Sequence, residues 1–365
     1  MRYPIRILHV LGRTDRGGAE SLVMNIYRNI DRNKIQFDFA IHTTDRCQFD
    51  DEIESLGGKI YHLPRYKIYN HVSYVQKWKN LLRNNNFLAI HGHMDSTASI
   101  YLKIAKDLSI PTISHSHSIS SGYGIKAVIT NLYHRNIENV SDYKFACSAE
   151  AGEWLYGRNS DFVIVKNGVD IKRFIFNEKT RKTIREQLGV QDNLVIGHIA
   201  NYTKPKNHKF LIEIFKKLSK ANPKVKLVLV GNKVEENLER IVKEYKLESK
   251  VIFLGTRSDI DRILQGFDIF VLPSIYEGLP VSLVEAQVSG LFCIVSDRVT
   301  KESEFTNNVK YLHIDRSDSV DCWVNCILDN REMEHQNLAS TLQNSEFNIE
   351  VTKDYFQNFY LSLYE

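Results

Sequence analysis

Short runs of β-branched and other apolar residues alternate along the chain with longer segments in which apolar residues recur at helical spacing. Short apolar runs bounded by turn residues are typical of buried strands, and the longer spacing is typical of amphipathic helices. Regular alternation of the two predicts βαβ units built around parallel sheets.

The first half of the chain carries one series of these predicted elements. A turn through Gly12, Gly17 and Gly18 follows the first strand and leads into a helix at residues 19–29. The strands are expected at residues 5–11, 37–41, 59–62, 88–91, 112–115, 143–147 and 162–165.

A second series begins after a polar helical stretch that follows Phe174. We expect strands at residues 194–199, 226–230, 251–254, 269–272 and 292–296, and helices at residues 210–221, 235–245, 260–264 and 281–289. Residues 351–364 form one more amphipathic pattern. The 365-residue length agrees with two α/β halves, because a single core stops growing at about 250–300 residues.

Composition excludes several classes of protein. Hydrophobic residues make up 43% and charged residues 25%, which is average for a soluble globular protein and excludes a wholly disordered chain. We find no run of about 18 apolar residues and no signal-peptide pattern, so we expect a cytoplasmic protein without membrane spans. The five cysteines lack zinc spacing and predict buried, reduced thiols.

Charge is unevenly distributed. Residues 1–173 carry 23 Lys and Arg against 17 Asp and Glu, and no acidic residue lies between Glu54 and Asp95. Within residues 59–83, basic side chains are interleaved with Tyr66, Tyr69, Tyr74 and Trp78. This segment is either an ordinary solvated surface or a peripheral contact with an anionic membrane at the inner face of the cell membrane. A nucleic-acid partner is not expected, because the candidate chemistry lies elsewhere.

The most informative chemical pattern is the segment at residues 274–286, which follows a predicted buried strand and enters a helix. Ligands of parallel α/β sheets bind outside the carboxyl ends of strands, and a helix start attracts anions. Glu277 precedes this helix and Glu285 lies about two turns along it, so the carboxylates are placed to accept hydrogen bonds from sugar hydroxyls. The alternative is a capped helix with two solvated glutamates.

The same segment resembles the E-x7-E signature of family-4, group 1 retaining glycosyltransferases, and in particular the branch that builds bacterial capsular and exopolysaccharides. Further matching motifs occur in the same order along residues 5–300, at 17–20, 115–117, 147–157, 166–170 and 206–211. The resemblance implies the GT-B fold, in which two Rossmann-like domains face each other across a cleft that holds the active site. We therefore expect an acceptor domain at residues 1–172, a donor domain at 173–350, and a C-terminal helix at about 351–365 that crosses back to the acceptor domain.

Several roles follow from the resemblance. Glu285 resembles the ligand of the ribose hydroxyls, and Glu277 resembles the carboxylate that contacts the donor sugar. Lys206 resembles the lysine that neutralises the departing diphosphate. Backbone amides of the segment Gly278, Leu279, Pro280 and Val281 are expected to hold the transferred sugar or the phosphates.

One departure from the family pattern affects catalysis. The family usually carries an arginine a few residues before the lysine, and here that position is Asn201. Loss of a preorganised donor to a developing charge costs about 2–4 kcal/mol in the barrier. Either Lys204 or another cation takes its place, or the enzyme is slow, or the chain is not catalytic by itself.

The remaining candidates lie in the first half. Gly17 and Gly18 let the backbone approach a ligand closely, or form an ordinary strand-to-helix turn. His117 resembles the family's active-site histidine, whereas His91 and His93 are interpreted as structural. We expect no metal and no other cofactor, because no Asp-x-Asp motif ends a strand and the lysine and helix start replace the metal.

These observations predict a metal-independent, retaining glycosyltransferase. It would move a sugar from a nucleotide sugar, most readily a UDP-sugar, to a hydroxyl of a lipid-linked oligosaccharide. The catalytic residues would be His117, Lys206 and Glu277, and the donor would contact Gly17, Gly18, Asn201, Lys206, Glu277, Gly278, Leu279, Pro280, Val281 and Glu285. The alternatives are a nucleotide-sugar epimerase on the same fold and a non-catalytic, nucleotide-sugar-binding partner subunit of another transferase.

Overall fold

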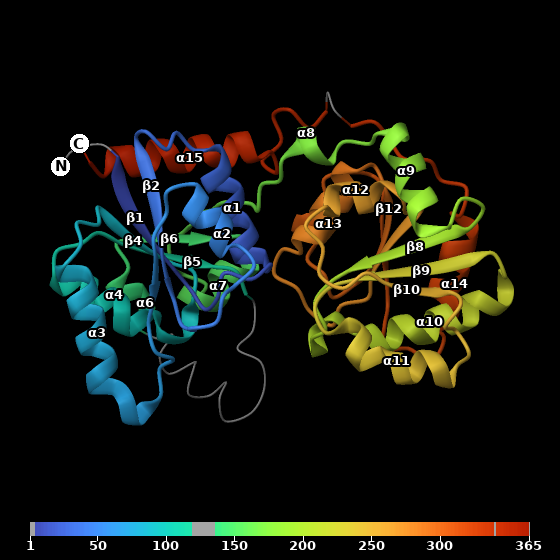
Figure 1. Ribbon diagram of the computed structural model, residues 1–365, viewed down its shortest axis with the longest axis horizontal. Helices are drawn as coiled ribbons and strands as arrows, with labels where there is room; N and C mark the ends of the chain where they lie inside the picture. Colours follow the sequence, from blue (N-terminus) through green and yellow to red (C-terminus); the bar gives the residue numbers. More distant parts are fainter. Residues whose placement is uncertain (1–3, 119–135, 339–340, 365) are drawn as a thin grey trace. The chain divides into compact units, whose positions relative to one another are not determined.

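The structure is a computed structural model that describes residues 4–118, 136–338 and 341–364. The chain forms two compact units, which Figure 1 shows in sequence colours. The first unit comprises Met1–Gly168 and Ser345–Glu365, and the second comprises Val169–Asn344. Each unit is built around its own parallel sheet, as the alternation of apolar runs and helical segments predicts.

The first unit contains a seven-stranded sheet in the order β3-β2-β1-β4-β5-β6-β7. All its strand pairs are parallel, and His9 of β1 lies in register with His91 of β4. The strands are β1 (Ile5–Leu11), β2 (Ile35–Ile41), β3 (Ile60–His62), β4 (Ala89–Gly92), β5 (Thr112–Ser116), β6 (Tyr143–Ala146) and β7 (Val163–Ile164).

Helices cover both faces of this sheet. Successive side chains of a strand point to opposite faces, so neighbouring residues pack against different helices. Ile7 of β1 packs with α1, α2 and α15, whereas the next residue, Leu8, packs with α3, α4, α6 and α7. The helices are α1 (Gly18–Asn29), α2 (Asp50–Ser55), α3 (His71–Arg83), α4 (Ala98–Asp107), α6 (Ile137–Val140), α7 (Ala149–Tyr156) and α15 (Ile349–Ser362), with short 3₁₀ turns η1 (Ile68–Asn70) and η2 (Asp95–Thr97).

The second unit contains a six-stranded parallel sheet in the order β10-β9-β8-β11-β12-β13. Its strands are β8 (Leu194–Ile199), β9 (Val225–Val230), β10 (Val251–Phe253), β11 (Ile269–Leu272), β12 (Phe292–Ser296) and β13 (Val309–Leu312). Its helices are α8 (Ile171–Phe174), α9 (Glu178–Leu188), α10 (His208–Ala221), α11 (Val234–Glu244), α12 (Ile260–Gln265), α13 (Val281–Val288) and α14 (Ser319–Asp329), with 3₁₀ turns η3 (Lys204–Lys206) and η4 (Lys301–Ser303).

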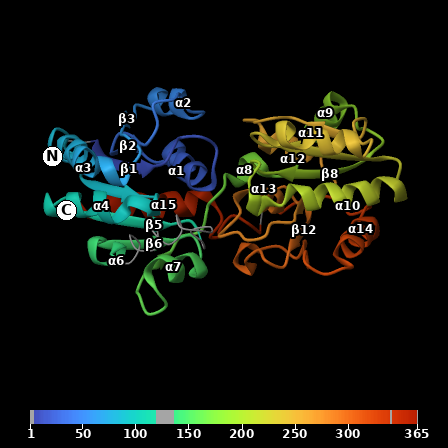
Figure 2. The ribbon, with the colours of Figure 1, turned by 90° about the horizontal axis from the view of Figure 1, so that it is seen from below.

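The last helix, α15, packs on the first unit, although the second unit precedes it in the sequence. It contacts α1 and β2, and Figures 1 and 2 show it beside α1. Ile349, Phe356 and Tyr360 are fully buried in the core that α1 and α2 share with β1 and β2. The expected return of a C-terminal helix to the N-terminal domain is therefore confirmed.

Strand order in both sheets marks a place for ligands. The order changes direction between β1 and β4 in the first unit and between β8 and β11 in the second. Loops at the carboxyl ends of two such strands diverge to opposite faces and leave a crevice, which is where open α/β sheets bind ligands. None of the helices in the described part of the chain is long and apolar enough to cross a bilayer.

Two local expectations were wrong. Tyr74 and Trp78 are not surface aromatics of a basic patch but fully buried core residues on the inner face of α3. Of the five cysteines, which are all free thiols, Cys322 is exposed rather than buried. All three residues lie on helices, α3 or α14, and the position of a residue around the helix decides whether its side chain is buried. The composition of the surrounding segment does not decide this.

Candidate donor-binding and active site

The donor-site candidates of the second unit lie on the loops that follow β8 and β11. Asn201 follows β8, and Lys206 is the last residue of η3, separated from α10 by Asn207 alone. Glu277 lies between β11 and α13. Because β8 and β11 are the two strands at the change of strand order, these residues share the edge of the sheet where a ligand is expected.

Lys206 and Glu277 form an ion pair across this edge. Lys206 Nζ lies 2.6 Å from Glu277 Oε1, and the side chains are 23% and 12% exposed. Ser274 Oγ donates a second hydrogen bond to the same Oε1 at 2.7 Å. The Ile275 amide also donates to the Pro205 carbonyl at 2.7 Å, so the two loops are tied through their backbones as well as their side chains.

Helix α13 begins at Val281, four residues after Glu277. Pro280 is the N-cap residue, and its side chain makes no capping hydrogen bond. The amides in the first turn of a helix lack intrahelical acceptors and attract anions. Pro280 has no N–H of its own, so the expectation that all four residues from Gly278 to Val281 offer amides is corrected to three.

Glu285 lies on the second turn of α13 and is partly buried. Helix α13 packs on α8, and the electrostatic neighbours of Arg173 on α8 include Glu285 and Asp261. Arg173 also donates to Asp261 Oδ1 at 2.6 Å. Residue Arg173 was not anticipated from the sequence, because nothing in the motif links α8 to α13.

Asn201 has a structural partner. Its Oδ1 accepts a hydrogen bond from the Asn232 amide at 2.9 Å, which joins the ends of β8 and β9. Gly231 lies at the same junction with φ of +150°, and a Cβ there would meet the Ala200 carbonyl oxygen at 2.0 Å. The side-chain amide of Asn201 thus fixes the loop where the family usually places an arginine, and it supplies no charge.

The first-unit candidates lie at the corresponding edge of the other sheet. Gly17 is the N-cap of α1 and Gly18 is its first residue, and neither has positive φ. Gly17 is extended, so no left-handed backbone conformation requires a glycine there. His117 follows β5, and β5 neighbours β4, one of the two strands at the change of strand order.

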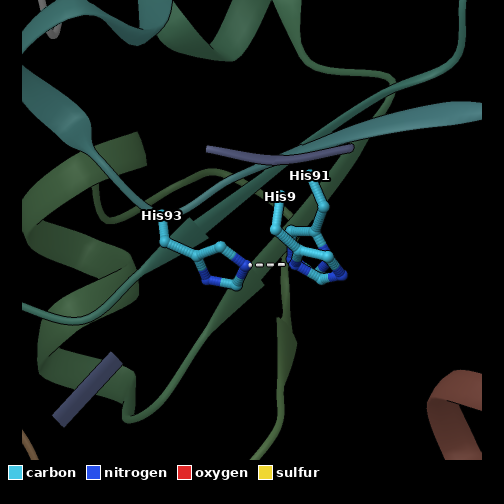
Figure 3. Close-up of side chains that lie close together, drawn as sticks. All are labelled: His9, His91 and His93. Atoms are coloured by element: carbon cyan, nitrogen blue, oxygen red, sulfur yellow. Dashed lines mark hydrogen bonds between the residues drawn. The ribbon is translucent and has the colours of Figure 1, made fainter. Parts of the chain in front are cut away.

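His117 is joined to two further histidines. His93 Nδ1 lies 2.9 Å from His117 Nε2, and His93 Nε2 lies 3.0 Å from His9 Nδ1. Figure 3 shows the His9–His93 hydrogen bond with the His91 ring beside it. Burial in apolar surroundings lowers the pKa of His9 and of His117 to about 3, so these rings are neutral at physiological pH.

Two more histidines, His91 and His115, stack on the rings of His93 and His117. The rings of His91 and His93 lie 4.3 Å apart, and those of His115 and His117 lie 4.2 Å apart. His91 Nδ1 is 2.6 Å from the Tyr360 hydroxyl of α15. His91 and His93 are two residues apart, as are His115 and His117, and this spacing predicts that both side chains of each pair point to the same face of the sheet. Their contact with His9 depends on the strand order, which places β1 beside β4.

Two family models match successive parts of the chain. The family model "Glycosyltransferase Family 4" matches residues 16–173, and "Glycosyl transferases group 1" matches residues 180–337. The chain is 36% identical over 308 residues to the putative glycosyltransferase EpsF of Bacillus subtilis, covering 81% of this chain and 80% of that protein.

Two further relatives carry more specific names. The N,N'-diacetylbacillosaminyl-diphospho-undecaprenol alpha-1,3-N-acetylgalactosaminyltransferase of Campylobacter jejuni is 30% identical, over 60% of each chain. The capsular polysaccharide biosynthesis glycosyltransferase CapH of Staphylococcus aureus is 25% identical, over 83% of this chain and 84% of that protein.

A solved structure shares the fold. Anabaena Alr3699/HepE in complex with UDP and glucose matches with a TM-score of 0.79 and 18% identity, covering 98% of this chain and 100% of that chain. The expected GT-B fold is thereby confirmed. From the two family models and the relationship to EpsF, the chain belongs to the group 1, family 4 glycosyltransferases.

Proposed function

We propose that this protein is a retaining, metal-independent glycosyltransferase that moves a sugar from a UDP-sugar to a hydroxyl of a lipid-linked oligosaccharide during polysaccharide synthesis. The observation that carries the proposal is the Lys206–Glu277 pair beside the start of α13, at the carboxyl ends of β8 and β11. One cation, one carboxylate and a helix start meet there, which fits a diphosphate joined to a sugar.

Each group has a part in the transfer. The bond between the anomeric carbon and the diphosphate oxygen breaks, the acceptor hydroxyl oxygen bonds to the same carbon, and the hydroxyl proton passes to the departing diphosphate. In the transition state negative charge develops on the diphosphate and positive charge on the sugar ring. Lys206 and the first-turn amides of α13 stabilise the diphosphate. Glu277 accepts hydrogen bonds from the sugar hydroxyls, and Glu285 accepts them from the ribose.

The finer parts of the proposal rest on the relatives. The HepE structure contains UDP and glucose, which supports a UDP-sugar donor. The name of the Campylobacter relative specifies a diphospho-undecaprenol acceptor, and CapH is named for capsular polysaccharide biosynthesis. These support a lipid-linked acceptor and a role in polysaccharide synthesis for this chain.

The central experiment is Lys206→Ala in a turnover assay, after UDP-sugars have been screened for binding and transfer. We expect kcat to fall by about 10²-fold or more, because the charge opposed by Lys206 develops mainly in the transition state. The matched control is Lys209→Ala, an exposed lysine on the first turn of α10, which should leave kcat unchanged. Unchanged turnover in Lys206→Ala would show that this lysine does not stabilise the leaving group.

The unusual Asn201 allows a further distinction. Asn201→Arg should raise kcat if the site lacks a cation, and should leave it unchanged if Lys204 already fills that role. If nucleotide binds but no sugar is transferred to any acceptor, the protein is instead a partner subunit of another transferase. Conversion of the nucleotide sugar without any acceptor would indicate an epimerase.

Metal independence has its own measurement. Lys206 and the helix start supply the positive potential that a metal ion supplies in other transferases. Turnover should therefore persist after treatment with EDTA, and added Mg²⁺ or Mn²⁺ should raise it less than twofold. Loss of turnover on chelation, with recovery on adding metal, would overturn this part of the proposal.

We also propose a peripheral contact between α3 and an anionic membrane surface. Ile68 and Tyr69 of the turn η1 and Val72 in the first turn of α3 are 70%, 83% and 82% exposed, which is unusual for large apolar side chains. Lys77 and Arg83 on the same helix are exposed as well, and Lys79 is partly exposed. Exposed apolar groups flanked by basic residues are typical of helices that bind at an anionic lipid interface.

Vesicle binding tests this contact. Binding to vesicles that contain phosphatidylserine should weaken as salt rises, because the Debye length shrinks from about 10 Å at 0.1 M to about 3 Å at 1 M. Replacing Lys77, Lys79 and Arg83 by Gln should weaken it further. The control replaces Lys209, Lys220 and Lys224, three exposed lysines of the second unit. Equal effects of the two triple variants would contradict a contact through α3.

A further inference from the structure

His9, His93 and His117 form a continuous chain of imidazoles that runs from the interior of the first unit to the candidate active-site histidine. The two links are 3.0 Å and 2.9 Å long, and the ring planes are within 17° and 29° of parallel. Ring centroids are 5.2 Å apart at both links. His9 and His93 are 1% and 8% exposed, so water does not compete for these bonds.

The arrangement fits hydrogen bonds better than a metal. Three nitrogens of His9, His91 and His93 lie within 4.8 Å of one another, as do three of His93, His115 and His117. A zinc ion bound tetrahedrally by two imidazoles holds each nitrogen at about 2.0–2.1 Å, and therefore separates them by about 3.3 Å. The observed 3.0 Å and 2.9 Å are shorter and match N–H···N hydrogen bonds.

Hydrogen bonding couples the tautomers of the three rings. A neutral imidazole has one N–H donor and one bare nitrogen acceptor. His93 uses both nitrogens in the chain, so it donates to one neighbour and accepts from the other. All three rings must then carry hydrogen on the same nitrogen, either Nδ1 in every ring or Nε2 in every ring.

The inner end of the chain selects between these states. His9 Nε2 is buried and has no hydrogen-bond partner in the part of the chain that the structure describes, and the ring of Phe37 lies 4.1 Å from that of His9. If hydrogen were on Nε2 throughout, His9 would bury an unpaired N–H among aromatic rings. Hydrogen on Nδ1 throughout moves the unpaired N–H to His117, a residue that is only partly buried, whereas His9 is 1% exposed. An unpaired N–H costs less at the less buried ring, where a ligand can accept from it, so hydrogen on Nδ1 is favoured.

We propose that His9 and His93 are positioning residues that hold His117 as the Nδ1–H tautomer, so that His117 presents a hydrogen-bond donor to an oxygen of the bound sugar or diphosphate. This inference rests on the proposed transferase function only for the identity of the ligand. His117 Nδ1 is buried and has no partner among the described residues, as expected for a donor that awaits a ligand. A ring with hydrogen on Nδ1 cannot accept a proton there, so His117 is not the base that activates the acceptor hydroxyl.

Nitrogen-15 NMR of the full-length protein, labelled at histidine, tests the tautomer directly. In the unliganded protein, the chemical shifts should show a protonated Nδ1 and an unprotonated Nε2 for His117. His93→Phe removes both links and should bring these shifts toward the values of an unconstrained mixture. His93→Asn should restore the wild-type pattern, because its side-chain N–H₂ can occupy the place of Nδ1 and donate to His117 Nε2.

His115→Phe is the matched control. His115 stacks on His117 at 4.2 Å, but neither of its nitrogens has a hydrogen-bond partner among the described residues. This variant keeps the ring stack and should leave the His117 shifts unchanged. If His93→Phe does not fold, His9→Phe cuts the inner link alone and should produce a smaller change in the same direction.

Several results would overturn the inference. A wild-type His117 with hydrogen on Nε2, or a His117 spectrum unaffected by loss of His93, would show that the chain does not set the tautomer. A shift of the His9 and His93 signals on adding one equivalent of Zn²⁺ would show a metal site instead. These measurements need no turnover, so they stand or fall separately from the transferase proposal.

Kinetics then test the consequence for catalysis. Once turnover is measurable, His93→Phe should lower kcat at least tenfold or so with a smaller change in KM, since misoriented or wrong-tautomer histidines cost rate more than binding. His93→Asn should recover most of that loss, and His115→Phe should remain close to wild type. Equal kcat in His93→Phe and His115→Phe would contradict a positioning role for His93.

Discussion

The carboxylate of Glu277 is oriented by two partners that share one of its oxygens. Ser274 Oγ and Lys206 Nζ both bond to Oε1, and no bond from the described residues ends on Oε2. The side chain is therefore fixed while one oxygen stays available for a sugar hydroxyl. Charge-assisted hydrogen bonds of this kind are short and geometrically specific, which agrees with the sugar contact that we propose for Glu277.

Glu285 leads to a separate prediction. Glu285→Gln removes the charge and keeps the shape, so UDP should bind at least about tenfold more weakly if the carboxylate holds the ribose by charge-assisted bonds. The melting temperature should change little, because the side chain is only partly buried. Calorimetric titration with UDP and a thermal melt provide the two measurements. A large loss of stability with intact UDP affinity would instead make Glu285 a structural partner of Arg173.

Single residues could be identified from the sequence, but their pairing could not. The family resemblance identified Lys206 and Glu277 as candidate site residues. The 2.6 Å contact between them, however, depends on β8 and β11 being neighbours in the sheet. Likewise His93 was interpreted as structural, because nothing local shows that it bonds to His9, 84 positions earlier in the chain. The order of the strands in the sheet determines which of these distant residues come into contact, and the local sequence pattern does not contain that order.

At the scale of elements, buried strands were the most predictable parts of the chain. Strands β1, β8, β11 and β12 begin and end where their apolar runs do. Helices α3, α4 and α14 and the edge strand β13 were not anticipated. Strand β13 is only partly buried, and α3 mixes buried Tyr74 and Trp78 with many polar residues, so their local patterns are weak.

Helix α15 yields a prediction about stability. Phe356 is fully buried against the first unit, so Phe356→Ala should lower the free energy of unfolding by about 3–5 kcal/mol. Tyr355 on the same helix is 40% exposed, and Tyr355→Ala should cost much less. Urea denaturation of both variants compares them. Similar losses would show that α15 contributes through its helical backbone and not through this buried ring.

At the scale of the whole molecule, the same arrangement occurs twice. Both sheets are parallel, and both change strand order beside the first strand of the unit. Both carry candidate residues at the carboxyl ends of the strands beside that point. The chemistry is divided between them. The second unit carries a cation and carboxylates, whereas the first carries neutral histidines.

Buried neutral histidines make stability depend on pH. Burial lowers the pKa of His9 to about 3 and those of His91, His93 and His115 well below the ordinary 6.5. Below pH 6.5 the unfolded chain therefore binds more protons than the folded chain. The free energy of unfolding therefore has its full value above pH 6.5. It falls as the pH drops from 6.5 toward 3, by up to about 1.4 kcal/mol per pH unit for each ring.

His115→Phe should flatten this dependence. Chemical denaturation between pH 7.5 and 5 should show a slope smaller by about one proton in the variant than in the wild type. Parallel profiles for His115→Phe and wild type would mean that His115 gains no protection from protonation in the fold.

The placement of α15 has a consequence for biosynthesis. A ribosome makes chain from the N-terminus at about 5–20 residues per second, and domains fold as their residues emerge. The second unit, Val169–Asn344, is synthesised in full before Ile349, Phe356 and Tyr360 are added to the chain. These three residues belong to the core of the first unit, which stays incomplete until then. The unit begun first is thus finished last. Until then the surface that Phe356 and Tyr360 cover, including the Nδ1 of His91, stays open to solvent and to chaperones.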